Sequence, residues 1–231
     1  MNRRHIVVIS GAGLSAESGL RTFRDNGGLW ENHRVEDVAT PEAWERDRTL
    51  VLKFYNERRK ALRDALPNPA HLEIASWERH SRVSVITQNV DDLHERAGST
   101  SVLHLHGELT KARSTSDPDL VLPIDGWELR EGDLCPLGSQ LRPHIVWFGE
   151  DVPEFSRAAE IVSTADLLIV VGTSLQVYPA ASLAWEAPEN ARRILVDPNP
   201  PDAPEFEIIA SKASDGLKSL SSQFKYEASG R

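Results

Sequence analysis

The sequence has almost no cysteine: Cys135 is the only one among 231 residues. A single cysteine cannot form a disulfide within the chain, and it cannot supply a zinc or iron–sulfur site that needs several thiolates. Because disulfides belong mainly to oxidising compartments, this usage is typical of a protein in a reducing one. We therefore expect a cytoplasmic location.

Long hydrophobic runs are also missing. The longest, Leu167 to Val171, is far shorter than the ~20 apolar residues that a membrane-spanning helix requires. The first residues lead into only four apolar positions, Ile6 to Ile9, fewer than the core of a signal peptide contains. The expectation is no membrane association and no export.

Basic residues are in deficit, since 26 Lys and Arg face 35 Asp and Glu, for a formal net charge of -9 at pH 7. Non-specific nucleic-acid binding depends on clustered cations that neutralise phosphates, so this balance argues against a nucleic-acid partner. It weakly favours basic peptides or proteins as substrates.

Apolar strands alternate with helical patterns along much of the chain. Strands are expected at residues 5–9, 83–87, 102–105, 167–171 and 193–196, and helices at 49–65, 70–78, 154–164 and 180–187. This alternation predicts an α/β fold with a doubly wound, parallel, Rossmann-like sheet.

Two segments break the alternation and are too long to be simple crossover connections. We expect one catalytic domain over residues 1–231 that consists of two lobes. The large Rossmann-like lobe takes about residues 1–25, 66–110 and 145–225, and the smaller lobe takes the insertions at about 26–65 and 111–144. The residues from about Lys225 are expected to be a frayed tail.

A glycine-rich turn follows the first expected strand. Residues 11–16, GAGLSA, fit the G-x-G-x-x-G/A dinucleotide pattern, in which glycines let backbone N–H groups approach a pyrophosphate. A tight turn without a ligand explains this hexapeptide equally well. A dehydrogenase would continue into a second strand that ends in an acid, but residues 20–30 read as loop. The sequence therefore indicates a phosphate site but not hydride transfer.

Polar residues follow three other expected strands, where a parallel sheet presents its ligand crevice. Gln88, Asn89 and Asp91 come after one strand and could bind ribose hydroxyls or a carboxamide, although a helix N-cap is an alternative. Residues 172–174 and 197–199 follow two later strands and could equally be ordinary turns.

Two histidines, His104 and His106, stand two residues apart and would share one face of a strand. Histidine suits a general base near neutral pH. A metal pair is the competing interpretation, but no third ligand follows at a convincing spacing. Position alone does not choose between the two histidines.

Together these segments resemble the sirtuins, the NAD-dependent protein lysine deacylases. The matching segments occur in the family's order: GAGLSAESGLRTFRD, TQNVDDLHERAG, HLHGEL, VWFGE and VGTS. The resemblance covers residue 10 to about 215. It implies NAD as a cosubstrate, acyl-lysine proteins or peptides as substrates, and a monomer.

Residue by residue, the resemblance places Asn89, Asp91 and His106 in the catalytic centre, with His106 as the base. It implies NAD contacts by Gly11, Ala12, Gly13, Ser15, Ala16, Glu17, Phe23, Arg24, Trp30, Gln88, Asn89, Asp91, Gly172, Thr173, Ser174, Asp197, Pro198, Asn199 and Ala213. It implies substrate contacts by Ala39, Tyr55, Arg58, Val146, Trp147, Phe148 and Gly149.

The implied reaction begins when the acyl oxygen attacks C1′ of the NAD ribose and expels nicotinamide. His106 then removes a proton from a ribose hydroxyl, which attacks the imidate carbon, so that free lysine and O-acyl-ADP-ribose leave. Two alternatives use the same features: an ADP-ribosyltransferase with another acceptor, and a non-enzymatic sensor of NAD or ADP-ribose.

The chain departs from the family where most sirtuins carry four cysteines that bind a structural zinc. The corresponding residues, 111–144, contain only Cys135, so we expect no zinc. Candidate core residues that replace it are Leu120, Val121, Leu122, Trp127, Leu129 and Leu134. A second departure is Asp197 to Asn199, where many relatives have Asn followed two residues later by Glu.

Tyr55 and Arg58 lie three residues apart, hence on one face of an expected helix. From the residues alone, a packed tyrosine beside a solvated arginine is the better interpretation. The pair also matches the Tyr-x-x-Arg of sirtuins that remove succinyl and malonyl groups. A phenol and a guanidinium suit a terminal carboxylate, and Ala39 would widen the acyl pocket.

Overall fold

A six-stranded parallel sheet forms the centre of the computed structural model, which describes residues 3–20, 29–30 and 33–229, with backbone only at 29–30 and 225–229. The strand order is β11-β10-β9-β1-β4-β5. The strands are β1 (His5–Ser10), β4 (Arg82–Thr87), β5 (Val102–His104), β9 (Leu167–Val171), β10 (Arg192–Val196) and β11 (Glu207–Ile209). Both central strands, β1 and β9, are buried along their whole length, as strands covered on two faces must be.

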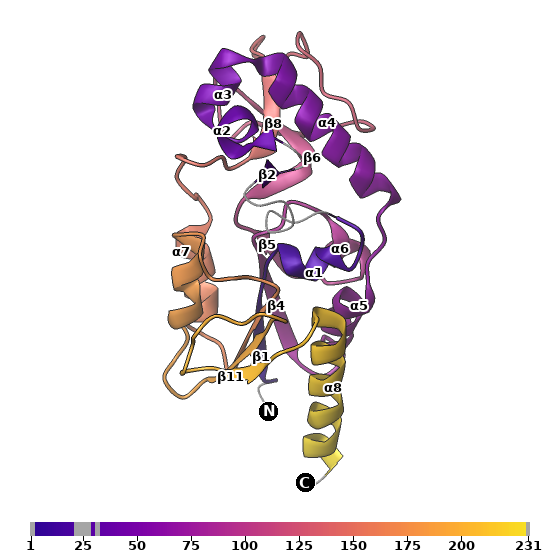
Figure 1. Cartoon of the computed structure of the whole chain (residues 1–231), viewed down its shortest axis with the longest axis vertical. Helices are drawn as coiled ribbons and strands as arrows, with labels where there is room; N and C mark the ends of the chain where they lie inside the picture. Colours follow the sequence, from indigo (N-terminus) through magenta and orange to yellow (C-terminus); the bar gives the residue numbers. More distant parts are fainter. Residues whose placement is uncertain (1–2, 21–28, 31–32, 230–231) are drawn as a thin grey trace.

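The two faces of this main sheet are covered by different helices (Figure 1). Val7 and Ile9 of β1 pack in one core with α7 (Phe155–Val162) and the 3₁₀ helix η2 (Ala180–Trp185). Ile6 and Val8 point the other way, toward α5 (Pro69–Trp77) and α8 (Ala213–Ser229). Alternate residues of a strand face opposite sides, so the predicted doubly wound sheet is confirmed.

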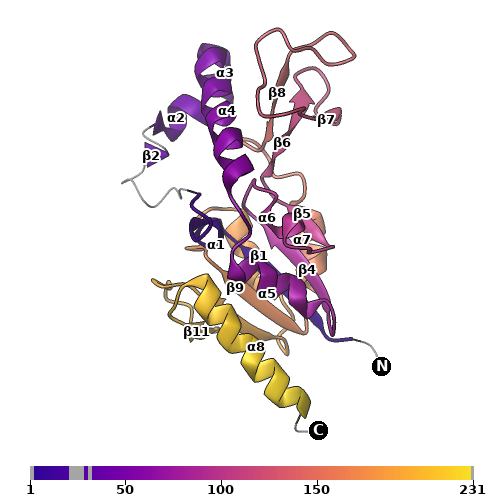
Figure 2. The same ribbon diagram turned by 90° about the vertical axis from the view of Figure 1, so that its right-hand side faces the viewer.

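A separate antiparallel sheet, in the order β7-β6-β8, lies at the opposite end of the molecule from the end of α8 (Figures 1 and 2). We call it the small sheet; its strands are β6 (Gly107–Ser114), β7 (Val121–Pro123) and β8 (Leu141–Ile145). It shares a hydrophobic core with α2 (Val35–Val38), α3 (Pro41–Arg46) and α4 (Arg48–Asp64). The remaining elements are α1 (Ala12–Ala16), α6 (Leu93–Arg96) and the hairpin of β2 (Leu29–Trp30) and β3 (His33–Arg34).

Local sequence explains where α3 and α4 begin. The Thr40 side chain accepts a hydrogen bond from the backbone N–H of Ala43, and Pro41 occupies the first helical position. Asp47 caps α4 in the same way by accepting from the N–H of Leu50. These caps orient the long helix α4, whose buried face carries Phe54 and Tyr55 into the core of the small sheet.

Several expectations need correction. The region after Lys225 is not a frayed tail, because the backbone of α8 is helical to Ser229. The helix expected at 180–187 is a 3₁₀ helix that ends at Trp185. Strand β11 and the small sheet were not anticipated. Within the described residues, no helix combines the length and apolar character needed to cross a bilayer.

The expected core of the small sheet is only partly right. Leu129 is buried, whereas Leu134, which forms an isolated antiparallel bridge with Gln140, is 57% exposed. The other candidates, Leu120, Val121, Leu122 and Trp127, are half-buried.

Polar side chains of α4 make a further connection to this sheet. Arg59 is 2% exposed and donates from Nε to the Leu109 carbonyl at 2.6 Å and from Nη1 to the Trp127 carbonyl at 2.8 Å. Asn56 pairs with both backbone groups of Leu129 at 3.0 Å. Burial lowers the pKa of Arg59 to about 10, so it remains charged at neutral pH. We call Asn56 and Arg59 the α4 clip.

We predict that Arg59→Met lowers the free energy of unfolding by about 2–3 kcal/mol, because two buried carbonyls lose a charged donor. Urea denaturation measures this difference. Lys60→Met is the matched control: Lys60 is exposed and lies over the Trp127 ring at 4.2 Å, a contact that contributes only about 0.5–1 kcal/mol. Equal losses in both variants would contradict the role of the clip.

Candidate active site

The carboxyl ends of the main-sheet strands bring distant segments together. Strand register pairs Ser10 with Thr87 on one side and with Val171 on the other, and Thr87 pairs with His104. Val171 in turn pairs with Val196 of β10. The residues that follow each strand, predicted as site residues from the sequence, therefore meet at one edge of the sheet.

Two glycine turns approach each other closely at this edge. The N–H of Gly11 donates to the Val171 carbonyl at 3.0 Å, and the N–H of Gly13 donates to the Gly172 carbonyl at 2.8 Å. A Cβ on Gly13 would lie 2.9 Å from the Gly172 Cα, and one on Gly172 would lie 2.3 Å from the Leu14 nitrogen. Glycine is required at both positions by this contact, a reason beyond the pyrophosphate approach inferred from the sequence.

Asn89 connects the loop after β4 to the glycine turn. Its side chain is buried and donates to the Gly11 carbonyl and to the Ser15 hydroxyl, both at 3.0 Å. Its backbone N–H donates to Oγ1 of Thr87 at 3.0 Å. Asn89 is thus fixed at both its backbone and its side chain.

Asp91 is also buried beside this loop and accepts from the Leu93 N–H at 3.2 Å. Burial raises its pKa, although hydrogen bonds from Ser15 and Leu93 and the charge of His104 oppose the shift. The N-cap alternative for Asn89 or Asp91 is wrong, because the N-cap of α6 is Asp92, which makes no side-chain cap hydrogen bond.

His106 is oriented by the residue before Asn89. Its Nδ1 lies 3.1 Å from the Gln88 carbonyl, which only accepts, so Nδ1 carries the proton. Burial lowers the pKa of His106, although the carbonyl raises it somewhat. At neutral pH the ring is therefore neutral, with a lone pair on Nε2. That is the state a general base requires.

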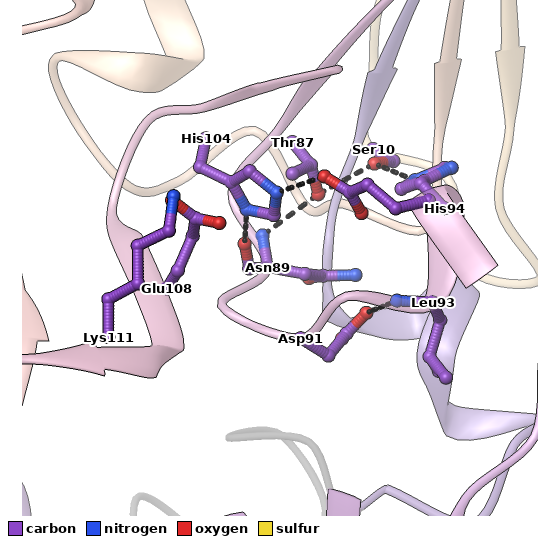
Figure 3. Close-up of polar contacts among 10 residues, drawn as sticks. Ser10, Thr87, Asn89, Asp91, Leu93, His94, His104, Glu108 and Lys111 are labelled. Carbon is purple, nitrogen blue, oxygen red and sulfur yellow. Dashed lines mark hydrogen bonds and ion pairs between the residues drawn. The ribbon is translucent and has the colours of Figure 1, made fainter. Parts of the chain in front are cut away.

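The expectation that His104 and His106 share a strand face is wrong, because β5 ends at His104 and His106 lies in the turn before β6. The two rings nevertheless point to neighbouring carbonyls. His104 places Nδ1 3.2 Å from the Asn89 carbonyl, as Figure 3 shows, and its Nε2 lies 2.8 Å from Glu95 of α6.

The segments after β9 and β10 complete the edge. Thr173 is buried, receives a weak hydrogen bond from the Gln88 amide at 3.4 Å, and precedes the half-buried Ser174. Asp197 is buried and accepts from the Asn199 N–H at 2.9 Å, while Pro198 is exposed.

The start of α8 reaches the same edge. Glu17, which follows α1, accepts from the Ser214 N–H at 3.1 Å and thereby brings buried Ala213 close to the turn. Ala12 and Ala16 of α1 are exposed.

The predicted substrate segment is bound directly to the turn of His106. The Val146 N–H donates to the His106 carbonyl at 3.0 Å, and the Phe148 N–H donates to the Ala39 carbonyl at 3.0 Å. Phe148 is 48% exposed, and Gly149 has a φ of +91°, a conformation that favours glycine. The segment is therefore held at both ends while one aromatic ring remains accessible.

Trp147 and Tyr55 meet within the small-sheet core. The indole N–H of Trp147 donates to the Tyr55 hydroxyl at 3.0 Å, and Tyr55 is fully buried. Burial raises the pKa of Tyr55, so its O–H stays protonated and able to donate. The Arg58 guanidinium lies 5.7 Å from the Phe54 ring, and its charge opposes the shift at Tyr55.

Sequence reasoning missed an ion cluster beneath this segment. The Glu150 carboxylate accepts from the Trp147 N–H at 2.8 Å, from Arg142 at 2.7 Å and from Arg113 at 3.0 Å. The Arg142 guanidinium also stacks 3.3 Å above the Trp147 ring. Burial alone would raise the pKa of Glu150, but the two arginines and the Trp147 N–H lower it. Of Glu150, Arg142 and Arg113, only Glu150 belongs to a motif identified in the sequence, as the last residue of VWFGE.

Three predicted cofactor residues are not placed here. Phe23 and Arg24 lie outside the described residues, and only the backbone of Trp30 is described, in β2. Over the part of the chain that the structure covers, His, Cys, Asp and Glu side chains form no group of three or more suited to a metal ion.

A buried chain of hydrogen bonds lies next to the loop of Asn89 (Figure 3). Ser10 donates to Thr87 at 2.9 Å, and its oxygen lies 2.9 Å from Nε2 of His94. Because the Ser10 proton goes to Thr87, Nε2 of His94 must be the donor. Burial keeps the pKa of His94 well below its usual value, and the His71 ring stacks edge-on against it at 4.9 Å.

A family model described as the Sir2 family matches residues 11–179. A protein of Aggregatibacter actinomycetemcomitans named NAD-dependent protein deacylase is 58% identical over 194 residues, which cover 84% of this chain and 93% of that protein. A protein of the same name from Bacteroides thetaiotaomicron is 49% identical over 225 residues, or 94% and 96% of the two chains.

Solved structures give the same relationship. A mutant Sir2 homologue in complex with ADP-ribose aligns with a TM-score of 0.89 at 39% identity, over 99% of this chain and 95% of that chain. A complex of a Sir2 homologue with NAD aligns with a TM-score of 0.85 at 39% identity, over 97% and 91%.

We predict that acid weakens the fold through His71, which is fully buried and whose pKa burial lowers to about 4. The unfolded chain takes up this proton below about pH 6.5, so the free energy of unfolding falls by about 2 kcal/mol between pH 7 and pH 5. His71→Gln removes the titration and keeps a side chain suited to the capping box with Asn68. Urea denaturation at both pH values should show a smaller fall in that variant.

The matched control is His80→Gln, since His80 is exposed in the turn after α5. An unchanged pH dependence in His71→Gln would contradict the assignment to His71.

Proposed function

The chain belongs to the Sir2 family, and from that premise we propose that it removes acyl groups from protein lysine side chains in an NAD-dependent reaction. The proposed products are nicotinamide, free lysine and O-acyl-ADP-ribose. The observation that carries this proposal is the orientation of His106, whose Nδ1 proton is held by the Gln88 carbonyl while its own carbonyl holds the substrate segment at Val146.

The residues at the strand ends suit NAD. The turns of Gly11, Gly13 and Gly172 present backbone where any Cβ would collide with a neighbour. Buried Ser15, Asn89, Asp91 and Thr173 offer hydroxyl, amide and carboxylate groups, the chemistry that binds ribose and carboxamide. Glu17 and Ala213 bring a second segment to the same edge.

NAD supplies a ribose carbon that becomes electrophilic when nicotinamide leaves. In that setting His106 accepts a hydroxyl proton at Nε2, because its Nδ1 proton is already committed to Gln88. Asn89 and Asp91 provide fixed dipoles and charge beside the reacting ribose without rearranging, since their positions are set by Gly11, Ser15 and Leu93. Val146 to Gly149 align the acyl-lysine with this base.

We propose that the acyl pocket accepts succinyl and malonyl groups as well as acetyl. Tyr55 keeps its proton and Arg58 its charge, and a carboxylate is well matched by one O–H donor and one guanidinium. Ala39 contributes a small buried side chain, and its carbonyl accepts from Phe148 of the predicted substrate segment.

The remaining proposals concern organisation and setting. We propose a single catalytic domain whose large lobe takes about residues 1–25, 66–110 and 145–225 and whose small lobe takes about 26–65 and 111–144. The core shared by α2–α4 and the small sheet supports this division. We also propose a monomer in the cytoplasm that binds acylated proteins and neither nucleic acid nor membranes, in keeping with its acidic charge and single cysteine.

The proposed activity is tested by incubating purified protein with NAD and matched acetyl-lysine and succinyl-lysine peptides, followed by mass spectrometry. We expect NAD-dependent loss of acyl mass, and His106→Tyr should lower the rate by at least about a hundredfold because the base is removed. His80→Tyr, at the opposite end of β4, should leave the rate unchanged. Transfer of label from NAD to protein without loss of acyl groups would instead indicate an ADP-ribosyltransferase. Binding of NAD with neither reaction would indicate a sensor.

We predict that Arg58→Met lowers desuccinylation by about tenfold to a hundredfold and leaves deacetylation largely intact, because only a succinyl group offers a carboxylate to the guanidinium. Steady-state rates on the two peptides measure the effect. Arg63→Met, an exposed substitution on the same helix, should change neither rate. Equal losses on both peptides would refute the pocket assignment.

We propose that this chain works without zinc and that the α4 clip and the shared core hold the small sheet instead. Elemental analysis should find no stoichiometric zinc, and a strong chelator should leave the melting temperature and the deacylation rate unchanged. One zinc per chain would overturn this proposal.

A further inference from the structure

His104 stands outside the reaction assigned to His106, yet it is one of the most constrained polar side chains near the site. It ends β5, and its side chain is 8% exposed. One ring nitrogen faces the backbone of Asn89 and the other faces the carboxylate of Glu95, at 3.2 and 2.8 Å. Figure 3 shows the ring above Asn89, with Glu108 and Lys111 of β6 to one side.

The hydrogen-bond partners of His104 determine the protonation state of its ring. The Asn89 carbonyl can only accept a hydrogen bond, and so can an ionised carboxylate at Glu95. Both nitrogens of His104 must therefore donate, which requires the imidazolium form. Two charge-assisted bonds then connect α6, through His104, to the backbone of Asn89.

The electrostatic surroundings favour the same state. Burial alone would lower the pKa of His104, but the hydrogen bond and charge of Glu95, with help from Glu108 and the Asn89 carbonyl, raise it. Burial likewise would raise the pKa of Glu95, and His104 lowers it. The charged and titratable groups that face the pair are Asp91 from the loop after β4, His94 from α6, and Glu108 and Lys111 from β6.

Glu108 and Lys111 are paired with each other at 2.6 Å, and His94 is neutral because burial lowers its pKa. Of the carboxylates that face His104, Glu95 is the one hydrogen-bonded to its ring, at 2.8 Å, so we take it as the partner that balances the charge of His104.

The target of this pair is the backbone of Asn89. Thr87 holds the N–H of Asn89, and Gly11 and Ser15 hold its side chain. His104 supplies the bond to the remaining backbone group, the carbonyl. Without it, the peptide between Asn89 and Val90 could rotate about the fixed Asn89 Cα and displace the chain that leads on to Asp91.

We propose that His104 is a positioning residue, which as an imidazolium held by Glu95 fixes the backbone of Asn89 for NAD cleavage. The proposal rests on the proposed function and assigns to the first histidine of HLHGEL a role separate from that of the base.

A dependence on pH follows. Below the raised pKa of His104 both bonds are intact; above it the neutral ring turns a lone pair toward the Glu95 carboxylate, and one bond is lost. The base His106 acts in the opposite sense, since it must be neutral and its pKa is lowered. As the pH is raised, activity should therefore first increase when His106 loses its proton. At higher pH it should decrease when His104 loses its proton.

The decisive variant is Glu95→Gln. The introduced amide can donate to Nε2 of a neutral His104, whose Nδ1 still donates to Asn89, so the contact no longer needs the charge. We expect activity near that of wild type at neutral pH and a much weaker alkaline fall in kcat. His104→Phe should lower kcat by about tenfold or more with both peptides, since the charge-assisted bond to the Asn89 carbonyl is lost together with the one to Glu95. His80→Phe is the matched histidine control and should retain full activity.

Nitrogen NMR of ¹⁵N-histidine-labelled protein reads the charge of His104 without any assay, and His104→Phe assigns its signals. Two protonated ring nitrogens at neutral pH, together with an alkaline fall that Glu95→Gln removes, would support the proposal. A neutral ring, an alkaline fall that persists in Glu95→Gln, or full activity in His104→Phe would overturn it. If wild-type protein deacylates neither peptide, the proposed function fails, while the NMR result still decides the state of His104.

Discussion

The close approach of two backbone turns is the constraint on which the rest of the site depends. Gly13 and Gly172 pack so tightly that neither position has room for a Cβ, and each turn donates or accepts hydrogen bonds across the gap. This contact fixes the glycine turn after β1 against the one after β9. Asn89 then attaches the loop after β4 to the same turn through Gly11 and Ser15. Three strand ends become one rigid edge, on which His106 can be oriented.

The connection from this edge to the small sheet is made by backbone as well as by side chains. The Val146 N–H donates to the carbonyl of His106, so the chain leaves the small sheet next to the turn of His106. Phe148 binds Ala39, which ties the same segment to α2 and α3. The Glu150 carboxylate, with two arginines and the Trp147 N–H, sets the turn between them. Residues 146–150 are thereby held by the turn of His106, by Ala39 and by two arginines.

Much of this arrangement could be predicted from the sequence, and the physical reasons for the failures are specific. Residues 167–171, for example, form a continuous apolar run, which is the sequence pattern typical of a buried parallel strand. The small sheet has no such pattern, because buried and half-buried residues alternate irregularly along β6 and its register with β8 shifts between Gly107 and Ala112. The histidine pair was placed on one strand because period-two spacing cannot show where β5 ends. Arg59, Arg113 and Arg142 read as surface charges, and only the fold reveals that each binds carbonyls or a carboxylate inside.

The position of β1 in the sheet has a consequence for how the chain is made. This strand precedes β4 in the chain, yet the other of its two neighbours, β9, begins only at Leu167. During synthesis β4 can cover one edge of β1 long before the other edge finds its partner. A strand with an apolar run such as Ile6 to Ile9 and an open edge is prone to pair with other chains. That edge of β1 therefore stays open until β9 has been synthesised, and the contact between Gly13 and Gly172 can form only after that point.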